Sequence, residues 1–274
     1  MKITGIKTYV LQAMLDDKGF GWSQRVTDKR QTAISVITTD EGIEGYGEAF
    51  YFGGPAKIVA GMIDDALGPL IVGKNPLDTS VIWDILYNWT RDQGMKGITI
   101  AAISAVDIAL WDIKGKALDL PVYQLLGGAY RNRARAYATG LYEPQGVPSR
   151  IDALVDEAMG YKNSGFSGMK LKIGYGIETD MSYIKDIREA IGPDLYLMVD
   201  ANHAYNASEA IQLARKMEPF DIYWFEEPVP PEDIDGYLEI KRHSNILVAG
   251  GECEYTRYGF RDLINRRAMD ILQP

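Results

Sequence analysis

The stretch Gly168-Met169-Lys170-Leu171-Lys172-Ile173-Gly174 is an apolar run that ends in glycine, and it is typical of a buried β-strand. Because side chains on a strand alternate between two faces, Lys170 and Lys172 are predicted to point the same way. Two neighbouring ammonium groups repel, so each is expected to lower the pKa of the other, and burial would lower both pKa values further. A lysine whose pKa approaches 7 can act as a general base. Lysine pairs at this spacing are common, so the pair alone favours a strand that carries two solvated lysines.

The strand belongs to an alternation of β-like runs and helical segments that begins at Arg133. The β-like runs are 134–139, 169–173, 195–200, 222–226, 246–250 and 269–273. The helical segments are 149–163, 180–191, 207–217, 231–242 and 257–267. Such alternation predicts a parallel sheet with helices on its faces, either open or closed into a barrel.

The first 130 residues have a different pattern, that of a small antiparallel meander followed by helices. Strands are predicted at 3–11, 31–38 and 43–49, and helices at 57–70, 78–90 and 99–118. Residues 16–28 join the first two strands through a glycine-rich, aromatic segment, which is either a mobile lid or an ordinary surface loop. The sequence therefore predicts an α+β domain at 1–130 and a (β/α) domain at 131–274 that holds strands 1–6.

Composition restricts the classes of partner. The chain has 274 residues, of which 46% are hydrophobic and 24% charged, as in an ordinary globular protein. Its net charge of −9 argues against nucleic acid and anionic membranes as main partners. The single Cys253 excludes an internal disulfide and fits a reducing cytoplasm. We expect neither a signal segment, since residues 1–5 have no apolar core, nor a membrane span.

Carboxylates recur at the predicted ends of three successive strands, at Asp200, Glu226 and Glu252. The intervals from Lys172 to Asp200, on to Glu226 and on to Glu252 are 28, 26 and 26 residues, or about one βα unit each. Function gathers at the C-terminal ends of strands in a barrel, and three carboxylates at one level repel unless a cation lies among them. Oxygen ligands of this kind suit Mg²⁺. The sequence therefore predicts a Mg²⁺ site, although one such carboxylate alone would more often be a helix cap or a solvated acid.

The strand ends carry one set of motifs: Lys170-Leu171-Lys172, Asp200, Glu226-Glu227-Pro228 and Gly250-Gly251-Glu252. A second set lies upstream, in residues 107–116 followed by Leu125-Leu126-Gly127-Gly128. Together they resemble the enolase superfamily, in its mandelate racemase subgroup, over essentially the whole chain. The resemblance implies a TIM-type (β/α) barrel with an N-terminal α+β capping domain, and one Mg²⁺ per subunit. It also implies a homo-oligomer, either a dimer or an octamer.

The resemblance further implies that the protein removes the proton next to a carboxylate in a small-molecule substrate. Lys172 would be the base on one face of the substrate, and Lys170 would tune its pKa. Asn202 would contact the substrate or a metal ligand, because it shares a strand face with Asp200 if that strand continues. Glu227 and His203 are expected to support the site from behind the ligands.

Within the subgroup, residues 86–88, 91–94 and 200–203 are similar to those of cycloisomerases that act on sugar-acid lactones, which implies a sugar acid or its lactone as substrate. Loops of the first domain largely set specificity in this fold, so Trp22 in 16–28 and Tyr51 in 48–54 are the expected substrate contacts. A sugar-acid dehydratase and a racemase or epimerase are the near alternatives.

The chain also departs from the pattern of the subgroup. It has six predicted strands where an eight-stranded barrel needs two more, and it lacks the histidine–aspartate dyad of the sixth and seventh strands. His243 falls in a helical segment and cannot replace that histidine. We therefore expect a fragment or a sequence that ends early, and a non-catalytic metal-binding relative stays an alternative. An unrelated barrel hydrolase is disfavoured, because only His203 lies at the strand ends and the lysine pair would have no role.

Overall fold

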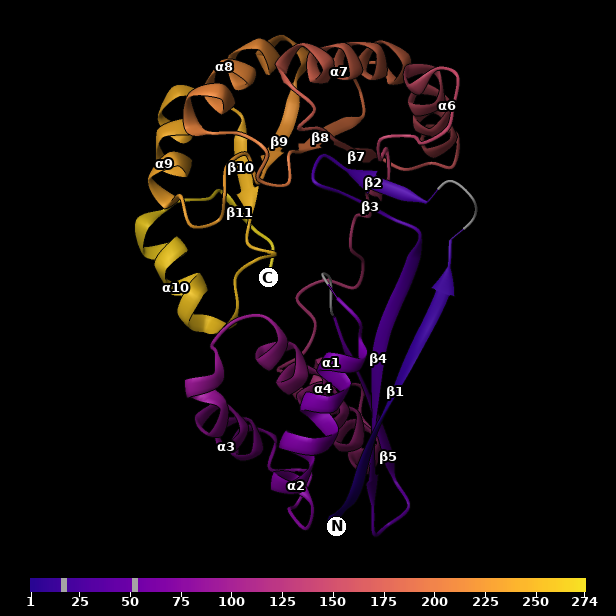
Figure 1. Cartoon of the computed structure of the whole chain (residues 1–274), viewed down its shortest axis with the longest axis vertical. Helices are drawn as coiled ribbons and strands as arrows, with labels where there is room; N and C mark the ends of the chain where they lie inside the picture. The colour runs from indigo at the N-terminus through magenta and orange to yellow at the C-terminus, as the bar shows by residue number, and fades with distance from the viewer. Residues whose placement is uncertain (16–18, 51–53) are drawn as a thin grey trace. The chain divides into compact units, whose positions relative to one another are not determined.

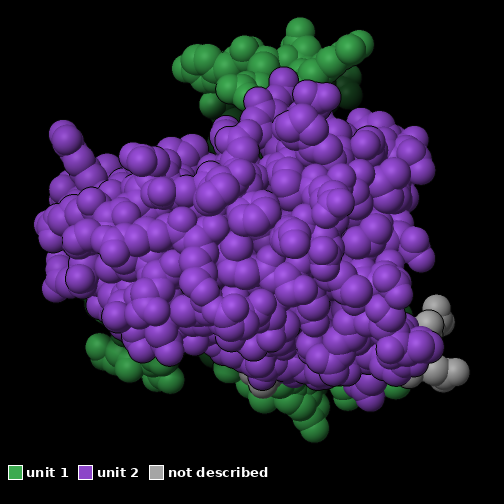
Figure 2. Space-filling model, turned by 90° about the horizontal axis from the view of Figure 1, so that it is seen from above, with its two compact units in different colours: residues 1–14, 29–133 green, residues 15–28, 134–274 purple. Residues whose placement is uncertain are grey.

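The computed structural model describes residues 1–15, 19–50 and 54–274. The chain forms two compact units, residues 1–14 with 29–133 and residues 15–28 with 134–274 (Figure 2). The boundary placed at residue 130 from the sequence stays a prediction. The contacts add a feature that the sequence did not indicate, because the segment 15–28 belongs to the second unit.

The first unit is a three-stranded antiparallel sheet that is packed against helices. Its strands are β1 (Ile3–Met14), β4 (Lys29–Thr39) and β5 (Glu44–Ala49), in the order β1-β4-β5. Its helices are α1 (Lys57–Gly61), the π-helix η1 (Met62–Leu67), α2 (Gly68–Ile71), α3 (Thr79–Thr90), the 3-10 turn η2 (Arg91–Gln93), α4 (Ile98–Leu118) and α5 (Val122–Leu125). In the described part of the chain, no helix is long and apolar enough to cross a membrane.

Helix α4 packs closely on β5 because small residues face each other there. A Cβ added at Gly47 would lie 1.9 Å from the carbonyl oxygen of Ala105, and one at Gly45 would lie 2.1 Å from that of Ala109. Only glycine permits this backbone approach. Ala105 and Ala109 on the helix thus lie against glycines on the strand.

The second unit is built on a parallel sheet with helices between successive strands (Figure 1). Within the described residues, six strands follow the order β11-β10-β9-β8-β7-β6. They are β6 (Ala138–Thr139), β7 (Gly168–Lys172), β8 (Tyr196–Asp200), β9 (Ile222–Glu226), β10 (Leu247–Gly250) and β11 (Ile271–Leu272). The helices are α6 (Arg150–Asn163), α7 (Ile177–Ile191), α8 (Ala207–Met217), the 3-10 turn η3 (Glu218–Phe220), α9 (Ile234–His243) and α10 (Thr256–Arg266). The chain thus has the two parts of the predicted fold class, a parallel α/β unit and a unit of antiparallel sheet and helices.

The two faces of this parallel sheet differ in chemistry. Leu171, Val199 and Phe225 lie on the face that packs against the helices, in one large apolar core. Met198 and Trp224 lie on the opposite face, in a small apolar cluster. Because side chains alternate, the lysines of β7 and the last residues of β8 and β9 share this second face. Polar chemistry therefore gathers on the side of the sheet away from the helices.

The segment that was predicted as a loop contains a short hairpin, β2 (Phe20–Trp22) paired with β3 (Arg25–Thr27). Figure 1 shows the hairpin beside β7. The ring of Phe20 meets that of Tyr142 edge-on, with centroids 4.8 Å apart. Since both residues belong to the second unit, this contact ties the hairpin to the parallel sheet.

Candidate active site

Three charged side chains lie at one level at the ends of adjacent strands. The strand register pairs Lys172 with Asp200, and Asp200 with Glu226, and each is the last residue of its strand. Lys170 lies two residues earlier on the same face as Lys172. The exposed fractions are 6% for Lys170, 7% for Lys172, 0% for Asp200 and 1% for Glu226, so the lysines are buried and not solvated.

Each ammonium group contacts a carboxylate. The Nζ of Lys170 lies 2.6 Å from Oε1 of Glu226 and 3.2 Å from Oδ2 of Asp200. The Nζ of Lys172 lies 2.6 Å from the same Oδ2 of Asp200. Asp200 thus bridges the two lysines, and the four groups form one buried network.

The pKa values follow from this network. Burial lowers the pKa of Lys170, but Asp200 and Glu226 raise it by more, so it lies above its usual value. The expectation of a lowered pKa is therefore wrong for Lys170, because its nearest charges are carboxylates and not the second ammonium. Burial raises the pKa of Asp200, but the two lysines lower it by more. Burial and the neighbouring Asp200 raise the pKa of Glu226 despite Lys170.

Asn202 is placed against the candidate base. Its Oδ1 accepts a hydrogen bond from Nζ of Lys172 at 2.9 Å, and its backbone N–H donates to Oδ1 of Asp200 at 3.0 Å. The strand has ended before Asn202, whose φ is +44°. The left-handed turn therefore orients Asn202 toward Lys172, where strand alternation was expected to do so. On another side, Nζ of Lys172 lies 5.5 Å from the ring centroid of Tyr142, at the range of a cation–π contact.

Two further side chains hold Glu226, and the sequence did not single out either. The indole N–H of Trp224 donates to Oε2 of Glu226 at 3.0 Å, and Nε2 of Gln273 donates to the same oxygen at 2.9 Å. The signal for Trp224 was its position two residues before Glu226, on the same strand face. Gln273 comes from the end of β11, and no local pattern indicates its reach to Glu226.

Glu252, the third predicted ligand, follows the end of its strand, whereas Asp200 and Glu226 are the last residues of theirs. The register pairs Glu226 with Ala249, and β10 ends one residue later at Gly250. Gly251 then turns the chain with φ +126°, so Glu252 lies in an exposed turn. In the described part of the chain, the carboxylates of Asp200, Glu226 and Glu252 do not form a close group of three. Its role as a ligand stays a prediction.

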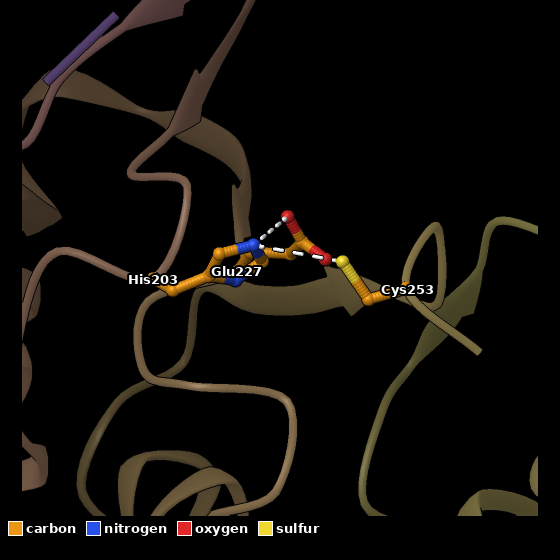
Figure 3. Close-up of side chains that lie close together, drawn as sticks. All are labelled: His203, Glu227 and Cys253. Carbon is orange, nitrogen blue, oxygen red and sulfur yellow. Dashed lines mark hydrogen bonds and ion pairs between the residues drawn. The ribbon is translucent and has the colours of Figure 1, made fainter. Parts of the chain in front are cut away.

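Glu227 and His203 lie together beside these ligands, with Cys253 next to them (Figure 3). Oε2 of Glu227 lies 3.3 Å from Nε2 of His203, which lies 3.7 Å from Sγ of Cys253. Burial raises the pKa of Glu227 to about 9, helped by Glu252 and Asp200. Burial also lowers the pKa of His203. Both groups therefore favour their neutral forms near pH 7.

The β2–β3 hairpin contacts the end of β8. Nε2 of Gln24 donates to the backbone carbonyl of Asn202 at 2.6 Å, and Oγ of Ser23 donates to that of Ala201 at 3.5 Å. Trp22, a predicted substrate contact, is the last residue of β2. Tyr51, the other predicted contact, lies outside the described residues. The sequence did not single out Gln24, because its partner Asn202 is distant in sequence and comes near only when the hairpin packs against the end of β8.

The donors at the strand ends fit a hard divalent cation. Asp200 and Glu226 are buried carboxylates at one level, and burial together with repulsion from Asp200 raises the pKa of Glu226. Carboxylate oxygens without sulfur or nitrogen donors suit Mg²⁺. These two donors, or three with the predicted ligand Glu252, leave positions for water and substrate oxygens, as Mg²⁺ prefers.

Comparison with known families and curated proteins finds the same two-part organisation. Residues 6–127 match the family model of the mandelate racemase / muconate lactonizing enzyme N-terminal domain, and residues 153–274 match that described as enolase C-terminal domain-like. The chain is 43% identical over 274 residues to D-galactarolactone cycloisomerase from Agrobacterium fabrum, covering 100% of this chain and 71% of that protein. It is 39% identical over 244 residues to arabinonate dehydratase from Saccharolobus solfataricus, covering 89% of this chain and 64% of that protein.

Solved structures show the same likeness. The 3,6-anhydro-D-galactonate cycloisomerase from Zobellia galactanivorans superposes with a TM-score of 0.89 at 46% identity, over 100% of this chain and 72% of that one. A racemase from Streptomyces coelicolor A3(2), solved with bound magnesium, gives a TM-score of 0.92 at 29% identity, over 99% of this chain and 75% of that one. The chain thus spans 64–75% of the length of these four proteins.

Proposed function

We propose a function from the premise that the chain belongs to the mandelate racemase / muconate lactonizing enzyme family of the enolase superfamily. The proposed reaction removes the proton next to the carboxylate of a sugar acid or sugar-acid lactone. The observation that carries this proposal is the buried network at the ends of β7, β8 and β9. In this network the proposed base, Lys172, lies at the same level as the two proposed oxygen ligands, Asp200 and Glu226.

Lys172 is the proposed base. Its Nζ is nearly buried and is held from two sides, by Oδ2 of Asp200 and Oδ1 of Asn202. A nitrogen that is held in one position and shielded from bulk water can take a proton from carbon only if the substrate binds next to it in one orientation. The ring of Tyr142 and the amide of Asn202 leave Nζ few directions in which to turn.

Lys170 has a different role in the proposal, that of holding the carboxylates. Its ammonium group contacts both Glu226 and Asp200, and its raised pKa keeps it charged at neutral pH. Trp224 and Gln273 hold the far oxygen of Glu226. When bound by Asp200, Glu226 and Glu252, Mg²⁺ would supply the positive charge that stabilises the substrate anion as the proton leaves.

The substrate class in this proposal comes from the relatives. D-Galactarolactone, 3,6-anhydro-D-galactonate and arabinonate, which their names give, are sugar acids or derived from them. A cycloisomerase and a dehydratase can share the first proton removal and differ in which bond breaks next. We therefore propose a cycloisomerase or a dehydratase, in a homo-oligomer, a dimer or an octamer, of the cytoplasm, where the single Cys253 would stay reduced.

Deuterium exchange tests the proposal directly. The full-length protein is incubated in D₂O with Mg²⁺ and a panel of aldonic acids, aldaric acids and their lactones, and loss of the α-hydrogen signal is followed by NMR. We expect exchange or product formation with at least one acid, and the NMR spectrum of the product separates ring opening from loss of water. Lys172→Ala should abolish exchange on one face, whereas Lys216→Ala, at an exposed ion pair, should not change it.

Metal removal provides a second measurement. We expect chelation by EDTA to stop exchange and added Mg²⁺ to restore it. Exchange that persists in Lys172→Ala at the wild-type rate would refute the assignment of the base. Absence of exchange on every acid of the panel, with Mg²⁺ shown to be bound, would refute the proposed reaction class.

A further inference from the structure

Three side chains of different chemistry meet next to the candidate active site. His203, Glu227 and Cys253, here called the HEC cluster, follow β8, β9 and β10 (Figure 3). One ligand atom from each lies within 4.8 Å of the other two. It is the one group of three or more such residues in the described part of the chain.

The separations in the HEC cluster match those of a tetrahedral metal site. Zn²⁺ binds nitrogen and oxygen at about 2.0–2.1 Å and sulfur at about 2.3 Å, so tetrahedral angles put N···O at about 3.3 Å and N···S at about 3.6 Å. In the structure, Nε2 of His203 lies 3.3 Å from Oε2 of Glu227 and 3.7 Å from Sγ of Cys253. Two of the three separations therefore match those of a tetrahedral site, and the third, from Oε2 of Glu227 to Sγ of Cys253, lies within 4.8 Å.

The backbone holds two of the three residues in place. The N–H of His203 donates to the carbonyl of Glu227 at 2.8 Å, and the N–H of Glu227 donates to the carbonyl of Ala249 at 3.0 Å. His203 has φ +66° and Glu227 has φ +41°, both in the left-handed region that non-glycine residues rarely adopt. Such conformations are strained, and they cluster at functional sites, where the surrounding structure holds them in place.

Glu227 supplies an independent sign of a ligand. The residue is 1% exposed, and its Oε2 has no hydrogen-bond partner among the described residues. This oxygen points toward the HEC cluster, where the imidazole of His203 lies 3.3 Å away without forming a hydrogen bond. A buried oxygen without a partner is costly, and coordination of a cation would satisfy it.

We propose that the HEC cluster is a second metal site, distinct from the carboxylate site, that binds Zn²⁺. Imidazole nitrogen and thiolate sulfur are ligands that Mg²⁺ avoids and Zn²⁺ prefers. Three protein ligands leave the fourth tetrahedral position open to water, and the side chain of His203, 20% exposed, gives that position access to solvent. The bound ion would tie together the turns that follow β8, β9 and β10.

Cobalt titration tests the proposal, because Co²⁺ replaces Zn²⁺ and reports its ligands by absorption. The full-length protein is titrated with Co²⁺ in excess Mg²⁺, which occupies the oxygen site. We expect one equivalent of Co²⁺ to produce a thiolate-to-cobalt absorption band and the visible bands of tetrahedral cobalt, and Zn²⁺ to remove both. Absence of the thiolate band in the wild-type protein would overturn the proposal.

Three variants make the test specific. Cys253→Ser should abolish the thiolate band, and His203→Gln should weaken Zn²⁺ binding by more than the roughly 10–100-fold that loss of a supporting hydrogen bond costs. His243→Gln is the matched control, because His243 is the other histidine of the chain and lies exposed on α9. Circular dichroism confirms folding. If His203→Gln does not fold, the smaller change Cys253→Ser decides, and a thiolate band that survives it would refute the proposed site.

Discussion

Replacement of Lys170 by methionine should destabilise the metal-free protein far more than replacement of an exposed lysine. Lys170 is the ammonium group shared by two buried carboxylates, at 2.6 Å from Glu226 and 3.2 Å from Asp200. Methionine keeps much of the side-chain volume and removes the charge. Oε1 of Glu226 then loses its hydrogen bond from Lys170, whereas Oε2 keeps those from Trp224 and Gln273.

The size of the expected loss in unfolding free energy follows from the burial of this ion pair. Removal of one partner from a buried ion pair costs about 3–5 kcal/mol, because the charge left behind is desolvated and unpaired. Lys172 still neutralises part of Asp200, so we expect the lower half of this range. Lys216→Met removes the partner of Glu178 at a surface where both side chains are about half exposed or more, and such pairs contribute about 0–1 kcal/mol.

Urea denaturation in EDTA measures both changes as free energies of unfolding, with tryptophan fluorescence as the signal. Mg²⁺ should restore most of the loss in Lys170→Met, because a cation at Asp200 and Glu226 would replace the missing charge. A loss below about 1 kcal/mol, equal to that of Lys216→Met, would refute the reasoning that the network is a buried charge pair. A full loss that Mg²⁺ leaves unchanged would show that these carboxylates do not bind the ion.

Three further changes test the loops around the site. Asp180→Asn replaces one of the two oxygens that accept from the backbone N–H groups of Gly174 and Tyr175 with an NH2 donor, and should cost about 1–3 kcal/mol of unfolding free energy by urea denaturation. Burial raises the pKa of Asp180 above 3.8. The difference in unfolding free energy between the wild type and this variant should therefore be greatest at acid pH and fall as pH rises through the raised pKa. A difference that grows with pH would contradict this sign. Gly174→Ala places a Cβ 2.8 Å from Oγ of Ser23 at φ +104°, so thermal denaturation should show a loss of about 1–3 kcal/mol, and an unchanged Tm would count against it. Gln24→Ala removes the hydrogen bond to the carbonyl of Asn202 and should raise KM more than it lowers kcat in steady-state kinetics, whereas a fall in kcat alone would assign Gln24 to the chemical step.

The parallel strands and the polar face of their sheet could be predicted because they depend on local patterns. Asp200 and Glu226 each end an apolar run, and the observed strands β8 and β9 end at these residues. The alternation of side chains also predicted that Lys170 and Lys172 share a face, and both contact Asp200. Two-residue periodicity is a property of the backbone, so it needs no knowledge of the fold.

The level of Glu252 could not be predicted in the same way. Its interval from Glu226 equals that from Asp200 to Glu226, but interval length mixes strand, helix and loop residues. The register pairs Glu226 with Ala249, three residues before Glu252, because the loops and helix between these strands are distributed differently. Equal spacing in sequence therefore indicates a repeated unit and does not fix a common level at the strand ends.

Long-range contacts were also beyond the sequence pattern. The segment 16–28 has the glycine and aromatic residues of a loop, and the short pairing of Phe20 with Thr27 gives a hairpin only three residues long on each side. Such a hairpin is marginal in isolation and depends on docking, here by Gln24 and Ser23 at the end of β8. Docking couples residues that are 178 positions apart, which no local window can detect.

The oxygen site and the HEC cluster are neighbours in sequence, so their independence is itself testable. Glu226 belongs to one and Glu227 to the other, and a rigid backbone between them could couple the two. Effects of distant changes add within about 0.3–0.5 kcal/mol, whereas residues in one network deviate from additivity by about 0.5–3 kcal/mol.

The double variant Lys170→Met with Cys253→Ser, compared with each single variant by urea denaturation in EDTA, measures this deviation. We expect additivity, because Lys170 contacts Asp200 and Glu226 while Cys253 contacts His203. A deviation above about 1 kcal/mol would mean that the turn after β9 transmits the loss of one site to the other. Occupancy by Mg²⁺ would then change the Zn²⁺ affinity of the HEC cluster, and Zn²⁺ would change the Mg²⁺ affinity by the same factor, since linkage between two binding sites is reciprocal.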